Sequence, residues 1–110
     1  MTVTDGRAEH LAQWVREMPL QSQVLITGTT LVLEGIARRR QDLPYPLDFV
    51  GLRESEEPAI AVALARSISS RYEGLAPVIG ADGVDENWRI SNMTRVVAEA
   101  IEHFYPSAAS

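Results

Sequence analysis

Apolar residues recur every three or four positions along most of the chain, a spacing typical of amphipathic helices. Near the N-terminus such a stripe is formed by Ala8, Leu11, Val15 and Met18, with Trp14 beside it. This pattern predicts a surface helix from about residue 4 to residue 18. Pro19 disfavours helical backbone in the residue before it and suits the first turn of a following helix. We therefore expect a tight corner at residues 18–20.

The segment from about residue 20 to residue 40 is apolar on several faces. Its centre, residues 24–33, also resembles a β-hairpin in composition, but strict alternation and an Asn-Gly or Asp-Gly turn are missing. A helix is therefore favoured, and its apolar surface predicts that it is the central element of the fold. Gly28 and Gly35 lie seven positions apart on one face of this helix, where we expect another helix to approach closely.

Residues 42–53 are predicted to form an extended crossover, because Pro44 and Pro46 are incompatible with a regular helix. The segment is rich in apolar and aromatic residues, unlike a flexible linker. It is therefore expected to pack against the bundle.

The third predicted helix has the clearest start and end signals. Ser55 is the expected N-cap and Pro58 lies in the first turn, while Gly74 is placed for a left-handed C-terminal position. The predicted buried stripe is Ile60, Leu64, Ile68 and Tyr72, flanked by Ala59, Ala61, Ala63 and Ala65. These small side chains indicate one close helical neighbour.

Residues 75–86 are expected to be irregular, and a last helix is expected from about Asn87 to Tyr105, capped by Asp85 or Asn87. Its predicted stripe is Ile90, Met93, Val97, Ala100, Ile101 and Phe104. The fold class predicted is all-α, a compact bundle of about four helices with two longer packed crossover loops. We expect a single domain over residues 1–110, with short frayed tails at 1–4 and 106–110.

Composition narrows the possible functions. The chain of 110 residues has no cysteine, which excludes disulfides and thiolate metal sites and fits a cytoplasmic location. Its net charge of -5 disfavours nucleic acid and anionic membranes as partners. All basic residues are arginine. This bias predicts a GC-rich bacterial genome, with avoidance of lysine modification as the alternative.

Few residues are suited to catalysis or to holding a metal. His10 and His103 are candidate ligand-binding residues if the terminal helices bring them together, and exposed helical histidines otherwise. Two imidazoles are too few for a usual zinc site, and the acidic segment 82–87 lacks the spacing of an EF-hand. No serine lies in a Gly-x-Ser-x-Gly motif. The sequence therefore predicts no catalytic residue, no metal and no cofactor.

These observations favour a small non-enzymatic module that self-associates or docks to a partner protein. Four apolar stripes in so small a domain are expected to leave part of their apolar surface exposed to solvent. The candidate contact residues are Trp14, Arg38, Arg39, Arg40, Tyr45, Phe49 and Trp88. One alternative is a small-molecule-binding regulator or minimal enzyme with a pocket between the helices and the Pro-rich crossover. Another is an acidic inhibitor or antitoxin-like protein.

Overall fold

The computed structural model describes residues 13–40, 42 and 47–109, and the description below refers to these residues. Its elements are η1 (Gln13–Glu17), α2 (Leu20–Arg38), α3 (Leu47–Arg53), α4 (Pro58–Glu73), α5 (Glu86–Phe104) and η2 (Pro106–Ala109), where η denotes a 3-10 helix. No strand forms in this part of the chain apart from one isolated β-bridge between Ile79 and Asp85. The predicted all-α helical bundle is confirmed.

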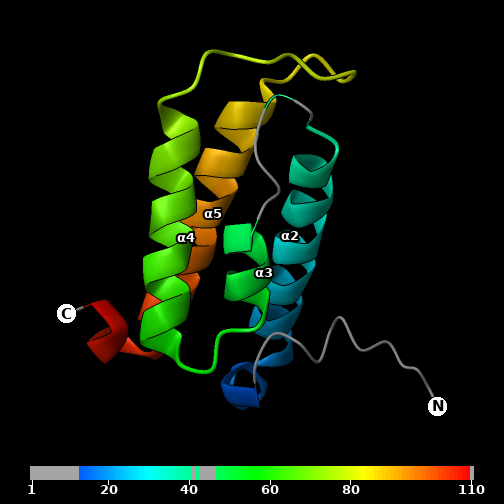
Figure 1. The fold of residues 1–110 in the computed structure, drawn as a ribbon. Coiled ribbons are helices and arrows are strands. Elements are labelled where there is room, and N and C mark those ends of the chain that lie inside the picture. The colour runs from blue at the N-terminus through cyan, green and yellow to red at the C-terminus, as the bar shows by residue number, and fades with distance from the viewer. Residues whose placement is uncertain (1–12, 41, 43–46, 110) are drawn as a thin grey trace.

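The four α-helices pack around one core. Figure 1 shows α4 and α5 side by side, the short α3 in front of them, and α2 at the edge of the bundle. Buried apolar side chains from η1 and from all four α-helices form one continuous cluster. The prediction that α2 is central was wrong, because α4 and α5 form the main helix pair and α2 packs against α5 and α3 on one side.

The choice of helix over hairpin for residues 24–33 is confirmed. The helix begins after Pro19, whose carbonyl accepts hydrogen bonds from the backbone N–H groups of Ser22 and Gln23. Ile26, Leu33 and Ala37 are buried on its inner face. The helical spacing of these residues therefore positions α2 on the core.

Only the end of the first predicted helix lies within the described residues, and there it is the 3-10 helix η1 rather than an α-helix. Val15 and Met18 are buried, as their place in the predicted stripe requires. The part of the prediction that covers residues 4–12 lies outside the described residues.

The prediction of an extended crossover over residues 42–53 was wrong for its second half, which forms α3. The two prolines precede this helix in sequence and so leave its backbone hydrogen bonds intact. Phe49 and Leu52, three positions apart, lie on one face and are buried in the core. Burial of this face stabilises a helix too short to be stable alone.

The predicted ends of α4 need two corrections. Glu57, not Ser55, is the N-cap residue, and Pro58 occupies the first helical position. The Ser55 hydroxyl instead donates a hydrogen bond to the Leu52 carbonyl, 2.9 Å away, at the end of α3. Gly74 has φ -85° rather than a left-handed conformation, whereas Gly83, in the loop before α5, has φ 80°.

The buried face of α4 is rotated from the one predicted. Ile60 is 46% exposed. The buried residues are Ala61, Val62, Ala65, Ile68 and Tyr72. Because Ala61 and Ala65 have small side chains and are fully buried, α4 and α5 can lie close together, as the alanine content predicted.

The last helix, α5, begins as predicted. The Asp85 side chain accepts a hydrogen bond from the backbone N–H of Asn87 and caps the helix. Ile90, Val97 and Ile101 are fully buried. Phe104, at the end of the predicted stripe, is exposed, and the expected frayed tail instead forms η2 over its described part.

The hydroxyl of Thr30 is buried in α2 and has no hydrogen-bond partner among the described residues. A buried polar group that lacks a partner costs about 1–3 kcal/mol. We therefore expect Thr30→Val, which replaces the hydroxyl by a methyl group, to raise the free energy of unfolding by about 1 kcal/mol. Urea unfolding followed by circular dichroism measures this change, and a variant less stable than the wild type would contradict the assignment.

Candidate functional site

An apolar stripe runs along the side of α2 that faces away from the core. Leu20, Val24 and Val32 are 72%, 61% and 61% exposed. They follow one another at spacings of four and eight residues, so they spread over about 120° of the outer side of the helix. We call the surface formed by Leu20, Val24, Gly28, Val32 and Gly35 the α2 face.

The two glycines of the α2 face differ in their surroundings. A Cβ atom added at Gly28 would meet nothing within 4 Å, and one added at Gly35 would meet only the Arg39 guanidinium, at 3.9 Å. The prediction that another helix approaches closely at these glycines was therefore wrong for the described part of the chain. No other described helix covers the surface of α2 at these glycines.

A groove separates α2 from the start of α5 and adjoins the α2 face. Its volume is about 550 Å³, and Val24, Gly28, Val32, Trp88 and Met93 are among the residues that line it. Trp88 is 58% exposed. The indole therefore forms an apolar edge of the groove beside α2.

The α2 face and its surroundings carry little charge. No Asp, Glu, Arg or Lys occurs between Leu20 and Leu33. Arg89, which lines the groove, forms an ion pair with Asp82. Along Leu20–Leu33 an apolar partner can therefore cover α2 without stripping water from a charged side chain, whereas at Gly35 the Arg39 guanidinium adjoins the face.

A buried ion pair joins α2 to α3. The Arg53 guanidinium donates to both carboxylate oxygens of Glu34, over 2.9 and 3.0 Å, and Arg38 donates to the same carboxylate over 2.9 Å. The hydrogen bond from Arg53 lowers the pKa of Glu34, against the opposing effect of burial. Sequence reasoning missed this pair, although Glu34 is the one charged residue in a long apolar run.

The three candidate arginines have different surroundings. Arg38 and Arg39 are exposed at the end of α2. The side chain of Arg40 is only 6% exposed and binds the carboxylate of Asp42 and the side-chain oxygen of Asn87. Arg40 therefore ties the end of α2 to the start of α5, unlike the exposed Arg38 and Arg39.

The candidate aromatic residues are also dispersed. Trp14 is half-buried, donates a hydrogen bond from its indole nitrogen to the Ser55 carbonyl and contacts the Tyr105 ring edge-on at 5.6 Å. Phe49 is 1% exposed and packs against Tyr72, so it is a core residue. Tyr45 lies outside the described residues.

The two histidines do not yield a ligand site in the described part of the chain. His103 is exposed on α5 and contacts the ring of the neighbouring Phe104. His10 lies outside the described residues. No three His, Asp or Glu side chains in the described ranges gather closely enough to hold a metal ion.

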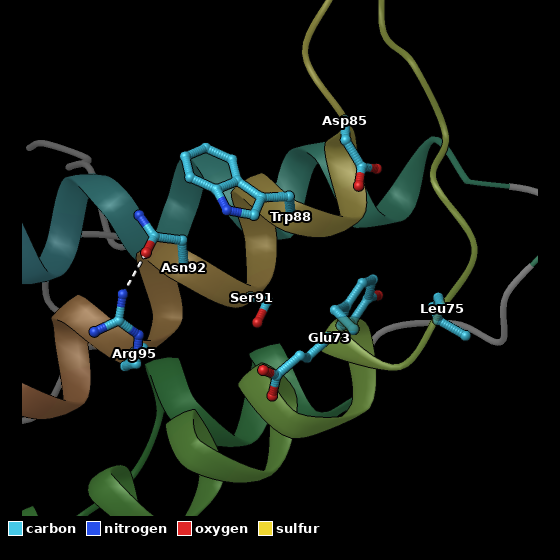
Figure 2. Close-up of a pocket in the computed structure, with 8 residues that line it drawn as sticks. Glu73, Leu75, Asp85, Trp88, Ser91, Asn92 and Arg95 are labelled. Carbon is cyan, nitrogen blue, oxygen red and sulfur yellow. Dashed lines mark hydrogen bonds between the residues drawn. The ribbon is translucent and has the colours of Figure 1, made fainter.

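A second, more polar pocket lies on the other side of Trp88, between the end of α4 and the start of α5 (Figure 2). It has a volume of about 220 Å³ and is lined by Glu73, Asp85, Ser91 and Arg95, among others. Three of these four side chains bind other groups of the chain: Asp85 caps α5, Ser91 donates to the Ser69 carbonyl, and Arg95 binds Asn92 and Glu99. These polar groups therefore mainly hold α4, α5 and their connecting loop together.

Comparisons with protein-family models, with curated proteins and with solved structures gave no match for this chain. None of the described helices is both long enough and apolar enough to cross a membrane. The surface of the molecule is therefore the basis for assigning a function.

Proposed function

We propose that the chain is a helical self-association module that binds a second copy of itself through the α2 face. The observation that carries this proposal is the set of exposed apolar residues on α2, with Gly28 between them. Contiguous apolar surface of this kind typically marks a site of protein association. Trp88, at the edge of the stripe, is the type of residue that often dominates the binding energy of such a site.

A second copy is favoured as the occupant by the distribution of charge. Each chain carries a net charge of -5, so two copies repel each other in general. A symmetric dimer places the same patch of both copies in contact, so a patch of one charge sign brings like charges close together. The segment from Leu20 to Leu33 has no charged side chain, and it is therefore suited to meet itself.

Burial of the apolar stripe supplies a driving force of the required size. Each fully buried Val or Leu side chain contributes about 1.5–3 kcal/mol relative to its exposed state. Leu20, Val24 and Val32 would be covered on both copies at once. Six such side chains and two indoles offset the loss of rotational and translational freedom, which is about 4–15 kcal/mol.

The variant Val32→Glu tests this function. Because Val32 is 61% exposed, the change leaves the core of the monomer intact. In a dimer through the α2 face it brings two carboxylates together, and we expect the dissociation constant to rise at least about a hundredfold, since like-charge contact costs several kcal/mol. Sedimentation velocity over a range of concentrations measures this change.

The matched control is Ile60→Glu, which places the same charge on an exposed apolar site of α4. It should leave the dissociation constant within a few fold of the wild-type value, and both variants should keep the wild-type circular dichroism. If Val32→Glu dimerises as tightly as Ile60→Glu, the α2 face is not the contact surface.

A further inference from the structure

The polar pocket between the end of α4 and the start of α5 has the lining of a ligand site. Figure 2 shows Trp88 and Asp85 of α5 on one side of this pocket and Glu73 of α4 on the other, with Ser91 between them. We infer that the pocket binds a small organic cation, an ammonium group on a short apolar stem. The charge lies beside Glu73 and Asp85 and the stem lies against Trp88. This inference does not depend on the proposed self-association.

Two carboxylates of the lining have oxygen atoms left for a ligand. Asp85 accepts hydrogen bonds from the backbone N–H groups of Val78 and Asn87, over 2.9 and 3.0 Å, and both reach the same oxygen, Oδ1. Its Oδ2, like the carboxylate of Glu73, has no hydrogen-bond or ion-pair partner among the described residues. Hydrogen bonds to an ionised group are roughly twice as strong as those between neutral groups. A cationic donor is therefore the partner that these oxygens favour.

The positive charge in the lining does not neutralise these carboxylates. Among the lining residues only Arg95 is basic, and it donates hydrogen bonds to the side chains of Asn92 and Glu99. Its charge is thus matched by Glu99, and Glu73 and Asp85 leave the pocket with an excess of negative charge. The net charge of -5 on the whole chain acts in the same direction. The pocket therefore attracts cations and repels anions.

The Trp88 side chain supplies the apolar part of the pocket. It is 58% exposed, so a ligand can reach the indole. A positive charge is attracted to the face of an aromatic ring, and most strongly to that of tryptophan. The pocket volume of about 220 Å³ is below the roughly 300–1,000 Å³ of sites for drug-sized molecules. The occupant is therefore a small ion.

Titration with phenethylammonium, followed by two-dimensional NMR, tests this inference. We expect saturable shifts of the Trp88 indole N–H and of the Asn92 backbone N–H, with a Kd on the order of 1 mM. The Trp14 indole N–H, which donates to the Ser55 carbonyl elsewhere in the fold, should not shift. Phenethyl alcohol has nearly the same shape without the charge, and it should bind at least about tenfold more weakly.

The variant Glu73→Gln removes one carboxylate and should raise the Kd for phenethylammonium about fivefold, the upper range for an ion pair at an exposed site. The matched control is Glu56→Gln, which removes the same charge from an exposed position before α4. It should change the Kd less than about twofold, because salt screens distant charges. An unchanged Trp14 indole signal shows that both variants are folded.

Three results would overturn the cation site: no saturable shift of the Trp88 indole N–H, equal affinity for phenethyl alcohol, or equal effects of Glu73→Gln and Glu56→Gln. A parallel titration with Nα-acetyl-lysinamide distinguishes the two sources of such a cation. Tighter binding than that of phenethylammonium assigns the site to a lysine side chain of a partner, and weaker binding assigns it to a free amine.

Discussion

Replacing Phe49 by alanine is expected to lower the free energy of unfolding by about 3–5 kcal/mol, the usual cost of truncating a buried phenylalanine. Phe49 is 1% exposed and contacts Tyr72 ring to ring at 6.3 Å, so its removal leaves a cavity between α3 and α4. Because α3 has only seven residues, it depends on this contact for its stability. Urea unfolding followed by circular dichroism measures the loss.

Leu47→Ala is the matched control, since Leu47 lies on the same helix but is exposed. Its effect should stay within about 0.5 kcal/mol, as for most surface substitutions. The folded fraction of Phe49→Ala should dimerise like the wild type. A variant with wild-type stability and impaired self-association would show instead that Phe49 is a contact residue.

A second large loss of unfolding free energy is expected from the substitution Arg53→Met. The Arg53 guanidinium is the main partner of the buried Glu34 carboxylate. Removal of one partner from a buried ion pair costs about 3–5 kcal/mol, because the other charge stays buried. Arg38 still contacts Glu34, so we expect a loss of about 3 kcal/mol, near the lower end of that range. Urea unfolding at neutral pH measures it.

Two further variants separate the charge effect from a packing effect. Arg38→Met removes an arginine that is half-exposed, and should cost less than about 1 kcal/mol. The double variant Glu34→Met with Arg53→Met removes both charges and should be more stable than Arg53→Met alone. If the double variant is less stable than the single one, the loss does not come from an uncompensated carboxylate.

The ion pair between Glu34 and Arg53 also predicts that the free energy of unfolding depends on pH. The folded pKa of Glu34 is lower than its ordinary value of 4.5, mainly because of the hydrogen bond from Arg53. A carboxyl group with a lowered folded pKa adds stability above its unfolded pKa, and this contribution is lost as the pH falls through the folded value. The difference in stability between the wild type and Glu34→Gln should therefore shrink steadily below about pH 4.5.

Local signals in the sequence predicted the long helices well. The three-to-four spacing of Ile90, Val97 and Ile101 and the cap at Asp85 place α5 almost correctly. The same signals missed α3, because two prolines indicate extended backbone while the short helix after them is stabilised mainly by the burial of Phe49 and Leu52. Such stabilisation is tertiary and has no local signature.

The candidate site was only partly predictable. Trp88 is 58% exposed, whereas Phe49 is a core residue and Arg40 is tied to Asp42 and Asn87. A helix that is apolar on several faces does not reveal which face its neighbours leave open. That depends on the close α4–α5 pair, which leaves α2 at the edge of the bundle (Figure 1).

The most direct test of self-association through the α2 face is the molar mass of the wild-type chain in solution. Light scattering or sedimentation equilibrium over a hundredfold range of concentration at ordinary ionic strength gives this mass. We predict a transition from a monomer of 12.1 kDa to a dimer of twice that mass, with no larger species. A mass that stays at the monomer value over the whole range would contradict the account.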